Sequence, residues 1–173
     1  MELNITNKNI KEFLGYKLFK KCECIKLNWL MYSDNNLLYY ENKTLKERFS
    51  NPNFNDSANI IIKSTIRGNL KFNYWKNMSN PHTSNNNFVS CSSSGKIISS
   101  QDFYIIPPDF KYALLKHYAT KTVEEYCWKL KRGRSDVRLE LNKKTLENIF
   151  ILFQKKYQGK NNNKWMIIKF LIL

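Results

Sequence analysis

The stretch Cys24-Ile25-Lys26-Leu27-Asn28-Trp29-Leu30-Met31-Tyr32 decides the fold of this chain. Its odd-numbered positions are all apolar, namely Ile25, Leu27, Trp29 and Met31. This two-residue period is typical of a strand that has one face on a core. Residues 33–36 are turn formers, Ser-Asp-Asn-Asn, and residues 37–40 resume an extended apolar run. We therefore predict a strand over 24–32 and a hairpin partner over 37–40.

On both sides of this strand the chain alternates short strands with short helices. Residues 10–18 have helical spacing, with a cap at Thr6 or Asn7. Thr122 and Glu125 have the spacing of a capping box, so another helix is expected to begin there. Further strands are predicted over 59–66, 88–91, 96–98 and 112–117, and further helices over 45–49 and 145–157. These elements predict an α/β domain with a mixed sheet and flanking helices.

The net charge of the chain is +15, from 29 Lys and Arg against 14 Asp and Glu. Such a charge taken alone favours a polyanionic partner, either a nucleic acid or an anionic membrane. Only five of the cations are Arg, however, and Arg is the residue that contacts phosphates and bases in bidentate fashion. We therefore expect solvated Lys side chains and no nucleic-acid partner, and we keep a peripheral membrane contact as an alternative.

The cysteine pattern and the chain termini bear on the compartment. None of the four cysteines has the spacing of a Cys-x-x-Cys pair or of a zinc finger with a histidine: Cys22, Cys24, Cys91 and Cys127. Residues 1–5 lack the basic and apolar segments of a secretory signal. The apolar run over 165–173 is too short to cross a bilayer. The sequence therefore predicts reduced thiols in a cytoplasmic protein.

Several stretches resemble one known group of enzymes. Residues 25–35, IKLNWLMYSDN, are similar to a tryptophan-centred motif that ends in a Gly-Asp-Asn-like turn. Residues 45–49, LKERF, match a Leu-x-Glu-Arg-Phe motif, and residues 116–126 with 129–136, KHYATKTVEEY and KLKRGRSD, match a third signature. Two smaller landmarks, KSTIR over 63–67 and Pro81-His82, fit the same order. Over about residues 7–158, the chain resembles the family-92-like and family-2-like glycosyltransferases, which have a GT-A-type fold.

Two departures from the pattern of that group stand out. Ser33 occupies the position of a usual glycine, and no Asp-x-Asp sequence occurs in the chain. In the group, this acidic motif lies just before the position of Glu2 and binds the divalent cation on the sugar-nucleotide diphosphate. The resemblance therefore implies the C-terminal portion of a GT-A-type domain, truncated at its N-terminus, over residues 1–158. Residues 159–173 are expected to be a linker and a short apolar tail, which a frameshift near Asn161 would explain.

The resemblance implies an enzyme, a glycosyltransferase that moves a hexose from a nucleotide sugar to a glycan or surface-polysaccharide acceptor. It also implies a divalent cation, Mn²⁺ or Mg²⁺, as cofactor. Because the acidic part of the cation site is missing, we expect the fragment to be inactive alone. Two alternatives stay open on composition: a small basic module that binds RNA or an anionic membrane, and a remnant without function. The basic module predicts association that weakens steeply with salt.

Seven residues are candidates for the site. His117 follows a predicted strand and precedes a capped helix, so we expect it to bind the metal or the diphosphate. Asp34 is the expected catalytic carboxylate, which holds or deprotonates the acceptor hydroxyl. The remaining five are expected to bind substrate or diphosphate: Lys121, Arg132, Arg134, His82 and Trp29. Each also has a structural interpretation, as a solvated cation, a turn residue or, for Trp29, a core residue. Arg48 is expected to pair with a carboxylate rather than with substrate.

Overall fold

The computed structural model describes residues 1–5, 9–35, 37–68, 81–82, 88–99, 101–119 and 121–132. The chain divides into two compact units. Unit 1 comprises Met1–Tyr32 and Asn51–Ala119, and unit 2 comprises Ser33–Ser50 and Thr120–Leu173. The predicted helix over 145–157, the tail over 159–173 and Arg134 lie outside the described residues. Within the described ranges, no helix has the length and apolar character needed to cross a membrane.

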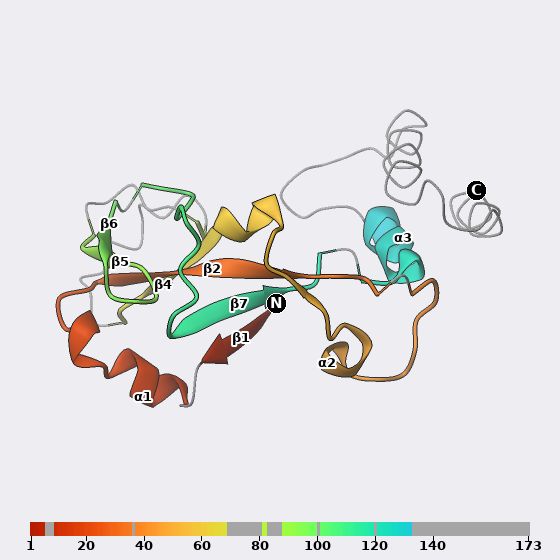
Figure 1. Ribbon diagram of the computed structural model, residues 1–173, viewed down its shortest axis with the longest axis horizontal. Helices are drawn as coiled ribbons and strands as arrows, with labels where there is room; N and C mark the ends of the chain where they lie inside the picture. The colour runs from red at the N-terminus through yellow and green to blue at the C-terminus, as the bar shows by residue number, and fades with distance from the viewer. Residues whose placement is uncertain are drawn as a thin grey trace. The chain divides into compact units, whose positions relative to one another are not determined.

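Unit 1 is built on a mixed sheet centred on β2 (Cys24–Tyr32), as Figure 1 shows. The seven strands of the described chain have the order β1-β7-β2-β5-β6, and β3 and β4 also pair with β2. β2 is antiparallel to β3 and β4 and parallel to β5 and β7. The other strands are β1 (Glu2–Ile5), β3 (Pro52–Asn53), β4 (Ile62–Ile66), β5 (Ser90–Cys91), β6 (Ile97–Ile98) and β7 (Ala113–His117). The predicted α/β class with a mixed sheet is confirmed.

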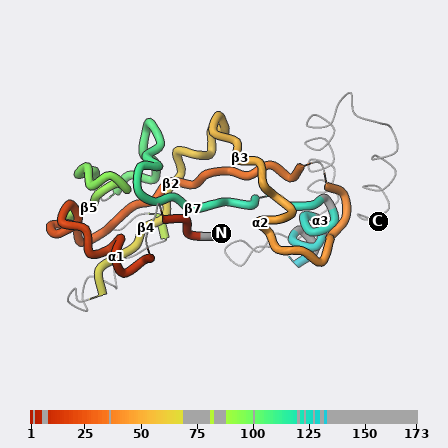
Figure 2. The backbone as a smooth tube through the Cα atoms, turned by 60° about the horizontal axis from the view of Figure 1, so that its bottom comes forward, coloured from red at the N-terminus to blue at the C-terminus, as the bar shows by residue number. Residues whose placement is uncertain are grey.

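One face of β2 packs on the hydrophobic core of unit 1. Ile25 and Leu27 are buried there against Phe13 of α1 (Ile10–Leu14) and Phe19 of the short 3-10 helix η1 (Lys17–Phe19). The rings of Phe13 and Phe19 meet edge to face with their centroids 5.0 Å apart. β7 runs alongside β2 in both views of the backbone (Figures 1 and 2) and contributes Ala113 to the same core. The alternation of apolar residues in the sequence therefore predicts this face correctly.

The opposite face of β2 is buried as well, and two of its residues, Lys26 and Asn28, are polar. Lys26 is 1% exposed, and its Nζ donates to the carbonyl oxygens of Ser99 at 3.0 Å and Asp102 at 2.7 Å. Asn28 is fully buried, donates to the carbonyl of Ile105 at 3.4 Å and accepts from the amide of Asp109 at 3.0 Å. These bonds hold one segment, residues 99 and 101–110, across the sheet, and we call this segment the strap. Burial lowers the pKa of Lys26, as expected for an ammonium group taken out of water.

The strap ends in a carboxylate that binds three consecutive serines. Asp109 accepts hydrogen bonds from the hydroxyls of Ser92, Ser93 and Ser94 and from the amide of Ser94 at 2.9 Å. The serines form the turn between β5 and β6, in which Gly95 has a φ of +79° and would meet Leu18 if it carried a Cβ. Burial by itself would raise the pKa of Asp109, but these hydrogen bonds lower it to about 2.

Asp109→Asn is expected to destabilise unit 1 by about 2 kcal/mol, because an amide cannot accept from all of these donors. The ionised carboxylate contributes stability that is present above its ordinary pKa of 3.8 and is lost as the pH falls toward about 2. The variant should therefore lose less stability than the wild type over that range. Acid unfolding followed by tryptophan fluorescence measures this. Asp102→Asn, an exposed carboxylate of the same strap, is the control, and an equal effect there would contradict the assignment.

Several boundaries differ from those predicted. Residues 37–40 are not a strand, because the carbonyl of Leu38 accepts from the amide of Glu124 and the amide of Tyr40 donates to the Glu124 carboxylate. Their backbone groups are thus bonded to α3 (Val123–Arg132) and not to β2. The predicted strand over 59–66 begins as a 3-10 helix, η2 (Ser57–Ile60). α1 is capped by Asn9, whose side chain accepts from the amide of Glu12.

Two features of unit 1 were not predicted. β1 precedes the first helix and pairs antiparallel with β7, with Leu3 opposite Leu115. Cys22 and Cys91 form a disulfide that joins the segment before β2 to β5. The prediction that all four cysteines are reduced is therefore wrong. Cys24 is a buried free thiol, and burial raises its pKa.

Candidate functional site

Three residues predicted for the site, Trp29, His82 and His117, come together in unit 1. Trp29 lies on β2 and His117 at the end of β7, and their rings stack with centroids 4.0 Å apart and planes inclined by 13°. The parallel pairing of β2 with β7 produces this contact, because it sets Trp29 opposite Leu115 and Met31 opposite His117. His82 meets Trp29 edge to face at 5.8 Å. All three side chains are partly exposed, so the cluster lies at the border of the core.

His82 is held by both of its ring nitrogens. Nδ1 bonds to the carbonyl oxygen of Ile62, and because a carbonyl only accepts, Nδ1 carries the proton. Nε2 then has a free lone pair and accepts from Nζ of Lys63 at 3.2 Å. Burial lowers the pKa of His82, and the Lys63 charge lowers it further, against the effect of the Ile62 bond. His82 is therefore a neutral ring with a structural role.

This arrangement bears on the predicted cation site. Among the described residues, no group of three or more His, Cys, Asp or Glu side chains is placed to hold a metal ion. Both ring nitrogens of His82 bond to protein groups, which leaves His117 as the candidate ligand. A divalent cation on a diphosphate takes several oxygen or nitrogen ligands. The described residues therefore do not by themselves fit a protein-held cation site.

Unit 2 is organised by a buried ion pair between Arg48 and Glu125. Arg48 lies in α2 (Leu45–Arg48), and its two terminal nitrogens reach the two carboxylate oxygens of Glu125 at 2.6 and 3.2 Å. The two side chains are 4% and 9% exposed. Glu125 also accepts from the amide and hydroxyl of Thr122, and the Glu125 amide donates back to that hydroxyl, so the predicted capping box is confirmed. The expectation that Arg48 pairs with a carboxylate is also confirmed.

The remaining predicted site residues lie in unit 2. Lys121 has a left-handed backbone, with a φ of 55°, and its ammonium lies 3.7 Å from Glu125, which already binds Arg48. Arg132 is exposed at the end of α3. Asp34 is only 5% exposed, and its carbonyl accepts from the amide of Leu37 to close the predicted turn. Arg134 lies outside the described residues.

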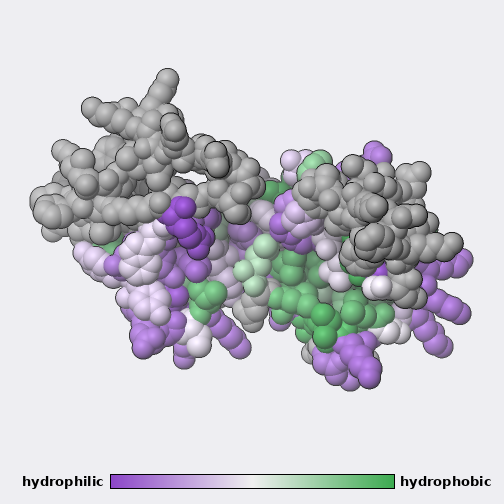
Figure 3. All heavy atoms as spheres, turned by 180° about the vertical axis from the view of Figure 1, so that it is seen from behind, coloured by the Kyte–Doolittle hydropathy of each residue, from purple (hydrophilic) through white to green (hydrophobic). Residues whose placement is uncertain are grey.

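A separate pocket of about 360 Å³ lies where β2 begins. Seen from behind, apolar side chains gather on the surface of unit 1 (Figure 3). Two charged side chains line this pocket, but Glu23 accepts from the amide of Val89 at 2.9 Å and Arg67 donates to the carbonyl of Phe19 at 3.0 Å. Both charges therefore stabilise the walls, and we assign no ligand to the pocket. Its lining is Leu14, Cys22, Glu23, Ile25, Thr65, Ile66, Arg67 and Gly68.

Sequence reasoning missed how the cluster continues beyond His82. The ring centroid of Phe103 on the strap lies 6.3 Å from that of His82, and the ring centroid of Tyr104 lies 6.3 Å from that of Phe103. The only sign in the sequence was a pair of adjacent aromatic residues before Pro107-Pro108. No family model matches the chain, and no curated protein and no solved structure is significantly similar to it.

Proposed function

We propose that the chain is part of a glycosyltransferase that takes a hexose from a nucleotide sugar and passes it to a glycan acceptor. What supports the proposal is the pairing of the stretches that resemble this enzyme group. Trp29 of the first stretch stacks on His117 of the third. Arg48 of the second bonds to Glu125 of the third, and Lys63 bonds to His82 across the two smaller landmarks. These three contacts, each within one unit, are the observation on which the proposal rests.

The proposal keeps the predicted chemical roles of His117 and Trp29, while those of His82, Arg132 and Arg134 stay predictions. Transfer needs positive charge near the leaving diphosphate and a carboxylate near the acceptor hydroxyl. Within unit 1, His117 is assigned to the diphosphate; the roles of Lys121 toward a diphosphate and of Asp34 toward a hydroxyl, both in unit 2, stay separate predictions. The stacked Trp29 and His117 rings offer a flat, partly exposed surface for a sugar or a base. A divalent cation, Mn²⁺ or Mg²⁺, belongs to the proposal through the resemblance, and the described residues contribute only His117 toward it.

His117→Ala is expected to weaken nucleotide-sugar binding by about tenfold or more, because it removes a polar contact to a charged group. Calorimetric titration of the full gene product with a panel of UDP- and GDP-sugars, with manganese present, measures this. Lys116→Ala is the matched control, because Lys116 precedes His117 on β7 and its side chain lies on the other face of that strand. If wild type binds and transfers none of these sugars, or if both variants bind them equally, the proposal fails.

We propose separately that the protein is cytoplasmic, and the Cys22–Cys91 disulfide provides a test of this location. Disulfides persist in oxidising compartments and are rare in the cytoplasm. Acid quenching of cells followed by thiol alkylation shows whether Cys22 and Cys91 are joined in the cell. If Cys22 and Cys91 are found joined in the cell, the protein lies in an oxidising compartment and the cytoplasmic proposal is wrong.

A further inference from the structure

The strap carries two exposed aromatic side chains and an exposed isoleucine on unit 1. Phe103, Tyr104 and Ile106 are 47%, 53% and 73% exposed. The rings of Phe103 and Tyr104 continue a row that begins at His117 and passes through Trp29 and His82, with centroid distances of 4.0, 5.8, 6.3 and 6.3 Å along the row. A row of rings therefore runs from the partly buried end of β7 to solvent. Exposed apolar side chains in a contiguous row usually mark a binding surface.

The backbone beneath these side chains is fixed. The carbonyl of Phe103 accepts from the amide of Ile62 at 3.3 Å, and the amide of Ile105 donates to the carbonyl of Ile60 at 3.0 Å. Tyr104 forms a β-bridge with Ile61, and Lys26 bonds the strap from below. The exposed rings are thus carried on a rigid support, which lowers the entropic cost of binding.

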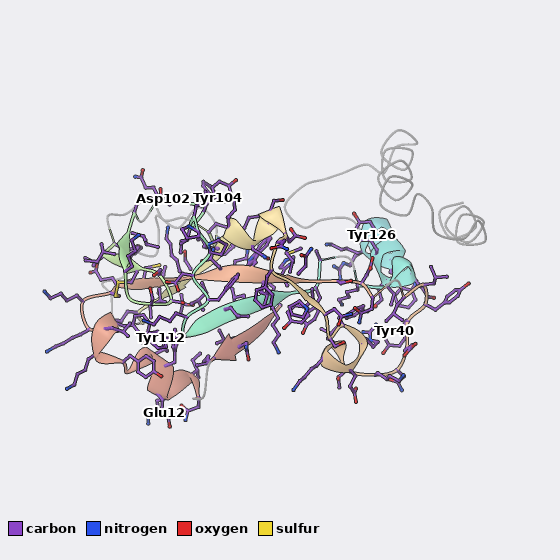
Figure 4. The ribbon with its side chains drawn as sticks, viewed as in Figure 1. Glu12, Tyr40, Asp102, Tyr104, Tyr112 and Tyr126 are labelled. Carbon is purple, nitrogen blue, oxygen red and sulfur yellow. A yellow bond between two sulfur atoms is a disulfide. The ribbon has the colours of Figure 1, made fainter. Side chains whose placement is uncertain are left out.

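The charge of the strap restricts what can bind to it. Residues 101–110 contain two Asp and no Lys, Arg or His, in a chain whose net charge is +15. The segment thus offers no cation of its own to an anionic lipid surface or a nucleic acid, and both need cations. Asp102 and Tyr104 lie together at the outer edge of the strap, away from β2 (Figure 4). A carboxylate accepts hydrogen bonds from hydroxyl groups, and the neighbouring Gln101 amide both donates and accepts.

We infer that the strap binds the sugar rings of a neutral glycan. The apolar C–H face of a pyranose stacks on the rings of Phe103 and Tyr104, and its hydroxyl groups bond to Asp102 and Gln101. Its role as the acceptor surface of an enzyme rests on the proposed function, whereas glycan binding itself does not. Because the row of rings reaches Trp29 and His117, a glycan on the strap extends toward the candidate site within unit 1.

Saturation-transfer NMR and calorimetric titration with chitohexaose, cellohexaose, maltohexaose and mannohexaose test the inference without donor or cation. We expect wild-type protein to bind at least one of them, and Tyr104→Ala to weaken that binding by about fivefold to tenfold. Tyr39→Ala is the matched control, since Tyr39 is 52% exposed and Tyr104 is 53% exposed. Asp102→Asn tests the hydroxyl contact and should weaken binding while the far-ultraviolet circular dichroism stays unchanged.

Three results would overturn the inference. One is that wild-type protein binds none of the four oligosaccharides. Another is that Tyr39→Ala weakens binding as much as Tyr104→Ala does. The third is that sedimentation with phosphatidylserine vesicles, and not oligosaccharide binding, depends on Phe103 and Tyr104. Oligosaccharide binding without any transfer from a nucleotide sugar would leave the inference standing and would remove only the proposed enzymatic function.

Discussion

Arg48→Ala is expected to lower the free energy of unfolding of unit 2 by about 3–5 kcal/mol, because it leaves the Glu125 carboxylate buried without its bidentate partner. Arg48 also packs over the rings of Tyr40 and Phe49, with its guanidinium carbon 4.9 Å from each ring centroid. The loss should fall on unit 2, and in particular on the first turn of α3. Hydrogen exchange of the α3 amides together with chemical denaturation measures both the size and the place of the effect.

A surface ion pair of unit 2 provides the control. Nζ of Lys43 lies 2.9 Å from a carboxylate oxygen of Glu41, but the two side chains are 61% and 42% exposed. Lys43→Ala should therefore leave the stability of unit 2 nearly unchanged, because an exposed ion pair contributes little. The double variant Arg48→Met with Glu125→Leu should cost less than the two single changes added together, because no buried charge is left unpaired. If Arg48→Ala and Lys43→Ala have similar effects, the buried pair does not stabilise unit 2 as we expect.

The same ion pair gives a pH dependence. Burial would raise the pKa of Glu125, but hydrogen bonds from Arg48 and Thr122 lower it below the ordinary value of 4.5. The stabilisation of unit 2 by the ionised Glu125 carboxylate is therefore present above pH 4.5 and is lost as the pH falls through the lowered pKa. In Arg48→Ala, the protection of the α3 amides from hydrogen exchange should therefore fall less with decreasing pH than it does in the wild type.

Reducing the Cys22–Cys91 disulfide is expected to lower the free energy of unfolding of unit 1 by about 4 kcal/mol. The two residues are 69 positions apart, so the bond removes much of the conformational freedom of the unfolded chain. Urea denaturation with and without dithiothreitol measures the effect. Cys91→Ser should show the lower stability already and should not respond to the reductant. A reductant effect of the same size on Cys91→Ser would contradict the role of this bond.

Local patterns in the sequence were sufficient to predict β2, the strands β5 and β6 and the start of α3. The alternation over 24–32 and the Thr122–Glu125 box each act within a few residues. The sequence also predicted a carboxylate partner for Arg48, and that partner is Glu125. Interactions of this kind leave a mark in the sequence, because the residue types are chemically specific.

The elements that were missed depend on partners far away in the chain. β1 has only four residues and no period of its own, and it becomes a strand because β7 supplies a partner. The alternation over 24–32 does not show what covers the other side of β2, where Lys26 and Asn28 bind the strap. Residues 37–40 have strand-like composition, but Glu124 takes their backbone bonds. Short-range patterns carry no information on such contacts.

The pairing of β1 with β7 has a consequence for synthesis on the ribosome. Leu3 is made before Leu115 and finds its partner only when Leu115 has also been made. During that interval β1 has no place in the sheet, and closing so long a loop is entropically slow. Late completion of this kind leaves β1 open to pairing with other chains, so we expect refolding yield to fall steeply as protein concentration rises.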